Sequence, residues 1–217
     1  MLTAADIIHQ IESTGVVAII RASSSDELID VVRALCDGGL TCIEVTMTTP
    51  NALELIRQAR DAVGDAAAIG VGTVLDAPTA RAAMLAGAQF VVAPGTDIPT
   101  IKLCRTHGVP ILPGAFTPTE IINAWKAGAD FVKVFPTSTV GAQYIKDLRG
   151  PLPQIKLVPT GGVTLDTVKD FIQAGANAVG VGSSLVTKQA VKNRDVTALK
   201  AAAAEWLKRV RQARESG

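Results

Sequence analysis

Short apolar runs alternate with longer amphipathic stretches along the whole chain. Eight runs of four to six residues, rich in Val and Ile, are predicted to be strands. Most of them lack strict polar alternation, which is typical of parallel strands covered on both faces. The runs are Val16–Ile20, Cys42–Met47, Ala68–Thr73, Phe90–Ala93, Pro110–Pro113, Phe131–Phe135, Lys156–Pro159 and Ala178–Gly182.

The stretches between these runs carry the spacing of helices with one apolar face. Clear examples are Asp26–Cys36 and a last helix at about Val196–Arg211. Thr3, followed three residues later by Asp6, resembles a capping box and predicts an additional helix before the first strand. The basic cluster over residues 208–214 is expected to be a solvated face near the end of the last helix.

Four segments repeat one pattern: GGLTCIEVT, AGAQFVVAP, AGADFVKVF and AGANAVGVG. Each has a helix-ending glycine, a short loop and a strand, and they recur every 41 to 48 residues. One period holds two strand–helix units, so four copies give eight strands. This favours an α/β fold, a single-domain (β/α)8 TIM barrel with an extra N-terminal helix, over a doubly wound open sheet. The helix is expected in residues 1–14, the barrel core in 15–185 and a C-terminal helical region in 186–217.

Composition narrows the class of protein. Lys and Arg total 21 against 20 for Asp and Glu, so no basic excess favours nucleic acid or an anionic membrane as a partner. No apolar run approaches the roughly 18 residues of a membrane span. The three cysteines are odd in number and lack metal-ligand spacing, and the N-terminus does not resemble a signal peptide. We therefore expect a cytoplasmic protein in a reducing compartment.

Two charged residues lie within predicted strands, near the ends where barrels build their active sites. Lys133 is the centre of FVKVF and Glu44 the centre of CIEVT. Side chains alternate along a strand, so Lys133 is predicted to point into the barrel together with Phe131 and Phe135. A solvated lysine on an edge strand is the alternative, but the sixth of eight barrel strands has no free edge. For Glu44, a purely structural partner of Lys133 remains an alternative.

Glycines follow the last two predicted strands. Thr160-Gly161-Gly162 comes after the seventh, and Gly182-Ser183 ends the eighth. Barrels often bind phosphate with backbone N–H groups of these two loops, although a Gly-Gly pair is also explained by a tight turn. No His, Cys and Asp cluster has the spacing of a metal site, so no metal is expected. Gly70-Val71-Gly72-Thr73 lacks the third glycine and acidic partner of a dinucleotide fingerprint.

The segments GLTCIEVT, GVGTVL, FVKVFP, PTGGV and GVGSSLV, in this order, closely resemble the bacterial 2-keto-3-deoxy-6-phosphogluconate aldolases. The resemblance runs from about Gly15 to Leu185. Enzymes of this family also act as 4-hydroxy-2-oxoglutarate aldolases. The resemblance implies a class I, metal-independent aldolase without a cofactor, on a TIM barrel that is usually a homotrimer.

The resemblance also implies roles for single residues. Lys133 matches the Schiff-base lysine and Glu44 the general acid/base. Arg21 matches an arginine of some members and would hold the substrate carboxylate, while other members place an arginine where this chain has Thr48. The remaining matches are the pocket-lining Thr73, Pro94 and Phe135, and the phosphate-binding Gly161, Gly162 and Ser183, to which the loop argument adds Gly182.

The implied substrate is a small 2-keto acid that is usually phosphorylated. Cleavage of 2-keto-3-deoxy-6-phosphogluconate would give pyruvate and glyceraldehyde 3-phosphate, and cleavage of 4-hydroxy-2-oxoglutarate would give pyruvate and glyoxylate. Galactonate-specific relatives carry an apolar residue in place of Thr160, so Thr160 points to the gluconate epimer, unless its hydroxyl only caps the following turn. The alternatives are the galactonate-epimer aldolase, another phosphate-binding barrel enzyme, or a binding protein.

Overall fold

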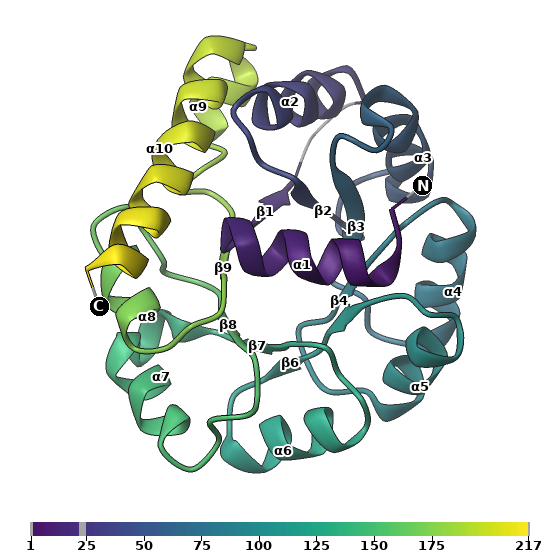
Figure 1. Ribbon diagram of the computed structural model, residues 1–217. Helices are drawn as coiled ribbons and strands as arrows, with labels where there is room; N and C mark the ends of the chain where they lie inside the picture. Colours follow the sequence, from purple (N-terminus) through teal and green to yellow (C-terminus); the bar gives the residue numbers. More distant parts are fainter. Residues whose placement is uncertain (1, 22–24, 217) are drawn as a thin grey trace.

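The computed structural model describes residues 2–21 and 25–216, in which parallel strands form a ring surrounded by helices (Figure 1). The strands follow the predicted apolar runs closely and are buried along their length. They are β1 (Val16–Ile20), β2 (Cys42–Thr46), β3 (Ala68–Gly72), β4 (Val91–Val92), β5 (Ile111–Leu112), β6 (Gly114–Ala115), β7 (Val132–Val134), β8 (Leu157–Pro159) and β9 (Val179–Val181).

The strands form two arcs of one closed barrel, with the orders β5-β4-β3-β2-β1-β9 and β6-β7-β8. β5 and β6 are two parts of the predicted fifth strand, interrupted at Pro113, which has no N–H to donate to the ladder. On the other side, a parallel bridge between Thr160 and Gly180 joins the end of β8 to β9. The predicted (β/α)8 barrel is thus confirmed, with a fifth strand that runs two residues beyond the predicted Pro113.

Helices cover the outside of the barrel and one of its ends. They are α1 (Ala4–Thr14), α2 (Ser25–Asp37), α3 (Ala52–Val63), α4 (Ala77–Leu85), α5 (Ile98–Thr106), α6 (Pro118–Lys126), the 3-10 turn η1 (Thr137–Thr139), α7 (Gly141–Arg149), α8 (Val168–Gln173), α9 (Lys188–Lys192) and α10 (Val196–Glu215). The predicted capping box starts α1: the Asp6 N–H donates to Thr3 Oγ1, and the Thr3 N–H donates to Asp6 Oδ2.

Helix α1 lies across the N-terminal end of the strands (Figure 1). Its Ile7 and Ile11 pack with the inner barrel residues, among them Phe90 and Phe131. Val132, a neighbour of Phe131, instead packs in the separate cluster between the strands and the outer helices. The alternation predicted for this strand is therefore confirmed, and α1 closes the bottom of the barrel with apolar side chains.

The internal repeat appears in the structure as a repeated hydrogen bond at the bottom of the barrel. Gln89, Asp130 and Asn177 occupy equivalent positions in three of the four copies. A side-chain oxygen of each accepts, at 3.0 Å, a backbone N–H from the start of the preceding strand: Ile69, Ile111 and Leu157, respectively. Each bond satisfies a backbone donor where the ladder begins.

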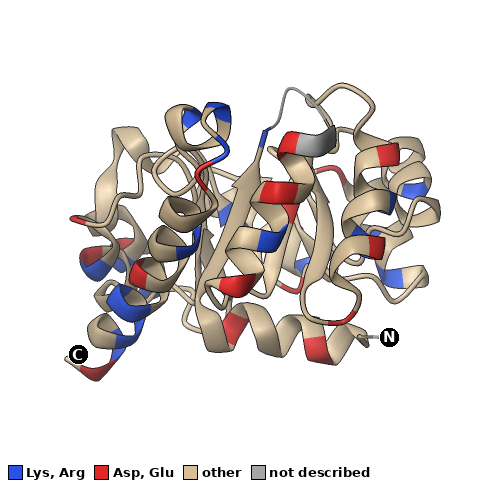
Figure 2. Cartoon of the chain, turned by 90° about the horizontal axis from the view of Figure 1, so that it is seen from above, with Lys and Arg blue, Asp and Glu red and all other residues tan. Residues whose placement is uncertain are grey.

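The last helix is tied to this end as well. The Arg214 guanidinium donates to the backbone carbonyls of Glu12, Ser13 and Asn177 at 2.7 to 3.0 Å. Arg214 therefore joins α10 to α1 and β9, instead of being only a solvated charge as predicted. Elsewhere Lys, Arg, Asp and Glu are mixed over the helices (Figure 2). Within the described ranges, no helix is long and apolar enough to cross a membrane.

Candidate active site

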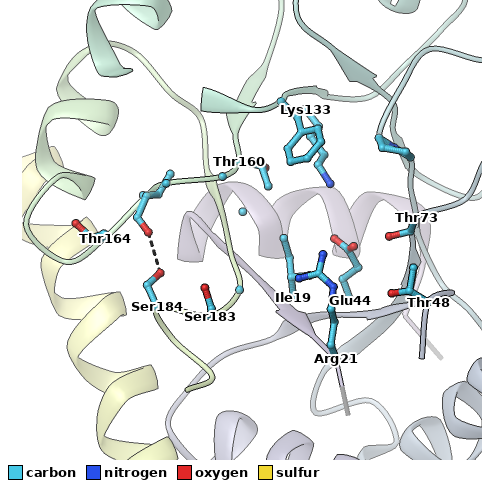
Figure 3. A pocket seen from close by; sticks show the side chains of 17 residues that line it. Ile19, Arg21, Glu44, Thr48, Thr73, Lys133, Thr160, Thr164, Ser183 and Ser184 are labelled. Carbon is cyan, nitrogen blue, oxygen red and sulfur yellow. Dashed lines mark hydrogen bonds between the residues drawn. The ribbon is translucent and has the colours of Figure 1, made fainter. Parts of the chain in front are cut away.

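The candidate residues from the sequence meet in one cavity of about 360 Å³ at the C-terminal ends of the strands, opposite α1 (Figure 3). Its volume suits a small metabolite. The candidates that line it are Arg21, Glu44, Thr48, Thr73, Pro94, Lys133, Phe135, Thr160, Gly161, Gly162, Gly182 and Ser183. The cavity is also lined by residues that the sequence analysis did not single out: Ile19, Val163, Thr164, Gly180 and Ser184.

Lys133 and Glu44 belong to one layer of side chains inside the barrel. Glu44, Val92, Lys133 and Gly180 are equivalent positions of the four repeats, on alternate barrel strands, and they line one small space in the interior. Because β2 and β7 are the second and sixth of eight strands, they lie on opposite sides of the ring. The Lys133 and Glu44 side chains accordingly point toward one another across the cavity (Figure 3).

Both charged side chains are buried: 7% of Lys133 and 1% of Glu44 is exposed. Lys133 Nζ lies 5.1 Å from the centroid of the Phe135 ring, which is 37% exposed and forms part of the cavity wall. The amine thus lies beside an aromatic ring in the wall of the cavity.

Glu44 reaches the cavity because its neighbour on β3 has no side chain. A Cβ placed on Gly72 would lie 1.6 Å from Glu44 Oε1, so any other residue at this position would displace the carboxyl group. Burial raises the pKa of the Glu44 carboxyl above its usual value of 4.5, and the nearby charges of Lys133 and Arg21 oppose this rise. A raised pKa suits a group that has to accept a proton and return it.

Arg21 follows β1 directly and brings a second cation to the cavity, near Glu44 (Figure 3). The Thr48 hydroxyl lies on the same side, 2.8 Å from the Thr46 hydroxyl, which is in turn 3.3 Å from that of Thr49. Arg21 therefore offers the site a fixed positive charge, whereas Thr48 offers a hydroxyl within a chain of threonines.

Thr73 follows β3 directly and has a strained backbone. Its φ is +59°, in the left-handed region that β-branched residues rarely adopt. This conformation holds a hydroxyl-bearing residue in the cavity wall between Glu44 and Pro94 along the strand order. Strained positions of this kind cluster at functional sites.

The loops after β8 and β9 lie together on one side of the cavity. Gly161 and Gly162 have φ values of +90° and +80°, so the tight-turn explanation for glycine holds here. Gly182 has an ordinary φ, and its carbonyl accepts the N–H groups of Leu185 and Val186, which starts a helical turn at the cavity. The Ser184 hydroxyl donates to the Val163 carbonyl at 2.8 Å and joins the two loops (Figure 3).

Thr160 is 5% exposed and lies at the inner end of these loops. Its hydroxyl donates backward to the Val158 carbonyl at 3.3 Å, not forward to the following turn. A Cβ on Gly180 would lie 2.3 Å from Thr160 Oγ1, so the missing side chain at Gly180 makes room for it. Because both residues line the cavity, the Thr160 side chain is part of its wall.

The cysteines are not placed for nucleophilic chemistry. Burial raises the pKa of Cys42 and Cys104 to about 12 and that of Cys36 to about 11, so all three are thiols at neutral pH. In the part of the chain that the structure describes, no three His, Cys, Asp or Glu side chains gather closely enough to hold a metal ion. Lys133 brings an amine to the cavity wall, beside several Ser and Thr hydroxyls.

The chain is similar to known proteins over most of its length. The model of the KDPG and KHG aldolase family matches residues 7–202. The chain is 37% identical over 170 residues to the 2-dehydro-3-deoxy-6-phosphogalactonate aldolase of Escherichia coli, covering 78% of this chain and 83% of that protein. It is 35% identical over 197 residues to the 2-dehydro-3-deoxy-phosphogluconate aldolase of Treponema pallidum, covering 89% and 93%.

A solved structure of KDPG aldolase from Legionella pneumophila, with pyruvate captured as a covalent carbinolamine intermediate, shares the fold. Its TM-score is 0.85 at 24% identity, and the match covers 94% of this chain and 97% of that one. The family match spans the barrel and every residue of the cavity described above. The chain therefore belongs to the KDPG and KHG aldolase family of aldehyde-lyases.

Proposed function

We propose that this aldolase cleaves 2-keto-3-deoxy-6-phosphogluconate into pyruvate and glyceraldehyde 3-phosphate, and 4-hydroxy-2-oxoglutarate into pyruvate and glyoxylate. It would act through a Schiff base, without a metal or other cofactor, as a homotrimer in the cytoplasm. The observation that carries the proposal is the pair of buried side chains, Lys133 and Glu44, which point toward one another across a single cavity.

Lys133 supplies the nucleophile. Its neutral amine attacks the C2 carbonyl of the keto acid and gives a carbinolamine, the kind of intermediate captured in the Legionella aldolase. Protonated Glu44 then gives its proton to the carbinolamine hydroxyl, and loss of water leaves an iminium between Lys133 Nζ and C2 and a carboxylate on Glu44. This iminium accepts the electron pair of the C3–C4 bond when that bond breaks.

Glu44 moves the protons. Its carboxylate takes the proton of the C4 hydroxyl as the C3–C4 bond breaks, so the aldehyde product leaves and a pyruvate enamine remains on Lys133. The protonated Glu44 then returns this proton to C3. Addition of water to the resulting iminium releases pyruvate and restores the amine. The raised pKa of Glu44 supports this exchange between its two protonation states.

The rest of the cavity positions the two ends of the substrate. The guanidinium of Arg21 has the charge and geometry to pair with the keto-acid carboxylate, next to Thr73 and Thr48. At the opposite side, the N–H groups of Gly161, Gly162, Gly182 and Ser183 would hold the phosphate. Binding at both ends orients the C3–C4 bond between Lys133 and Glu44.

Trapping with borohydride and pyruvate tests the central claim. Borohydride adds hydride to the iminium carbon and leaves a stable secondary amine, so the peptide that contains Lys133 gains the mass of a reduced pyruvate. Another phosphate-binding barrel enzyme, or a binding protein, would gain no such mass. An adduct on a different lysine, or none at all, would refute the proposed mechanism.

The galactonate-epimer aldolase is the second candidate, favoured by the 37% identity to the Escherichia coli enzyme. The two substrates differ in configuration at C4, whose hydroxyl has to reach Glu44. We assign the gluconate epimer because Thr160 puts a hydroxyl in the cavity wall, and one hydrogen bond of this kind discriminates by about 1–3 kcal/mol.

The substitution Thr160→Val tests this assignment. It should lower kcat/KM for the gluconate substrate and narrow or reverse the preference between the epimers. The measurement is the ratio of kcat/KM for the two purified epimers, before and after the substitution. If the ratio does not change, Thr160 does not read the C4 configuration.

A further inference from the structure

One buried hydroxyl outside the cavity holds the loop that forms part of its wall. Thr137 is fully buried at the start of η1, two residues after Phe135. Its N–H donates to the Thr160 carbonyl at 3.0 Å, and its Oγ1 lies 2.7 Å from the Gly161 carbonyl and 3.1 Å from that of Thr160. The Thr160 carbonyl already accepts the Thr137 N–H. The Thr137 hydroxyl has one proton, and we assign its hydrogen bond to the closer carbonyl, that of Gly161.

This hydrogen bond fixes the direction of a peptide group. In a trans peptide the carbonyl and the N–H of the next residue point in opposite directions. A Gly161 carbonyl that points at Thr137 therefore turns the N–H of Gly162 away from Thr137. Both glycines line the cavity, while Thr137 does not.

The loop needs such a restraint because two glycines follow one another in it. Without Cβ atoms, the peptide between Gly161 and Gly162 can rotate at little cost, and both residues have positive φ. Ser138 restrains the same place sterically: a Cβ on Gly162 would lie 2.7 Å from Ser138 Cα. The η1 turn thus supports the Gly-Gly turn from behind, and Thr137 supplies the directional contact.

We propose that Thr137 is a positioning residue that holds the Gly161–Gly162 peptide so that its N–H faces the cavity and binds the phosphate of the substrate. This inference rests on the proposed function, because it requires a phosphate in this part of the cavity. Thr137 itself touches neither substrate nor Lys133; it acts through the loop.

The test compares two variants that differ only in the hydroxyl, Thr137→Ala and Thr137→Ser. KM and kcat are measured for 2-keto-3-deoxy-6-phosphogluconate and for 4-hydroxy-2-oxoglutarate, which has no phosphate, together with the inhibition constant of inorganic phosphate. Thr100→Ala and Thr100→Ser are the matched controls. Thr100 is also buried; it lies on the outer helix α5, and its hydroxyl donates to Asp97, the residue before that helix, away from the cavity.

Loss of one such hydrogen bond should raise KM for the phosphorylated substrate, and the inhibition constant of phosphate, about tenfold in Thr137→Ala. KM for 4-hydroxy-2-oxoglutarate and trapping of pyruvate on Lys133 should stay near their wild-type values. Thr137→Ser should restore phosphate binding, and both Thr100 variants should leave it unchanged. If Thr137→Ala does not fold, Thr137→Val removes the hydroxyl with nearly the original volume.

Other outcomes separate the two levels of the argument. Equal losses on both substrates, or no rescue by Thr137→Ser, would make Thr137 a merely structural residue and overturn the inference while the aldolase function stands. Wild-type protein that traps pyruvate but is not inhibited by inorganic phosphate would overturn the phosphate site and this inference together. Wild-type protein that traps no pyruvate would overturn the proposed function itself.

Discussion

The two ends of the barrel are built from the same four repeats and have become different. At the bottom, Gln89, Asp130 and Asn177 keep the same hydrogen bond to the preceding strand in three copies. In the layer nearest the cavity, the equivalent positions hold Glu44, Val92, Lys133 and Gly180, four residues with nothing in common.

This difference separates stability from chemistry along each strand. The bottom positions satisfy backbone groups next to an apolar core, a task that three of the four copies share, so these three remain alike. In the upper layer, one copy has the carboxyl group of Glu44, one the apolar side chain of Val92 and one the amine of Lys133. The fourth has Gly180, which has no side chain. Departure from the repeat, and not the repeat itself, thus marks the residues that we assign to catalysis.

The largest expected effect is a loss of kcat on replacing Lys133, compared with replacing Lys156. Each of these lysines lies over a phenylalanine ring, one at each end of the sixth barrel strand. Lys133 Nζ is 5.1 Å from the Phe135 ring in the cavity, and Lys156 Nζ is 5.4 Å from the Phe131 ring at the bottom. Lys133→Met should lower kcat by more than about 10³-fold, because the electron sink is lost. Lys156→Met should retain activity. Steady-state kinetics of the two variants check this, and an equal loss in both would remove the distinction between the ends.

A second pair of substitutions lies on β3, two residues apart on its inner face. A Cβ on Gly72 would meet Glu44, and a Cβ on Gly70 would lie 2.5 Å from the Phe90 ring. Gly72→Ala should lower kcat about 10²-fold by displacing the carboxyl group, with little change in Tm. Gly70→Ala should instead cost about 1–3 kcal/mol of stability through overpacking.

Calorimetry and kinetics on both glycine variants measure this division. The comparison fails if Gly70→Ala loses kcat as strongly as Gly72→Ala, because the lower layer would then be part of the catalytic machinery. It also fails if Gly72→Ala is fully active, because catalysis would then not depend on the position of the Glu44 carboxyl group.

The smallest effect concerns the stability cost of the buried carboxyl group. Below the usual pKa of 4.5, Glu44 is protonated in both the folded and the unfolded chain. As pH rises, the unfolded chain ionises first, because burial raises the pKa in the folded protein, and the free energy of unfolding falls. Glu44→Gln has no such loss, so its Tm should match the wild type near pH 4.5.

At neutral pH the glutamine variant should have the higher Tm. Each 1 kcal/mol by which the ionised carboxyl group lowers the free energy of unfolding should correspond to about 2–4 °C in Tm. Scans of wild type and variant from pH 4.5 to 8 give the difference directly, and the same samples should show that the variant has lost cleavage activity. A Tm difference that does not change with pH would mean that the carboxyl group imposes no cost on the folded chain.

Much of this arrangement could be predicted from the sequence because it follows patterns that are visible along the chain. The repeat spacing gives the barrel, and two-residue alternation gives the inward direction of Lys133. The end of the fifth strand was missed because Pro113 breaks the ladder without ending the strand, so that Gly114 and Ala115 pair again. A proline in an apolar run gives no sign of which of these will happen.

The residues that support the site were harder to find because they act across strands. Gly72 matters only through the side chain of Glu44 on the neighbouring strand, and Gly180 only through Thr160. Thr137 matters through two carbonyls that lie more than twenty residues further along the chain. A single sequence shows such a glycine or threonine, but it does not show which residue contacts it in the folded protein.

The pairing of β1 with β9 has a consequence for the order in which the protein is made. β1 finds β2 early in synthesis, but its other edge waits until β9 has left the ribosome, almost a whole barrel later. During that interval five buried apolar residues border an unpaired edge, which is a template for mispairing with another chain. The Arg214 contacts to α1 form later still. The nascent protein is therefore most prone to mispairing at the β1 edge that later pairs with β9. Crowded ribosomes, or slow translation of the last quarter of the message, should increase its aggregation.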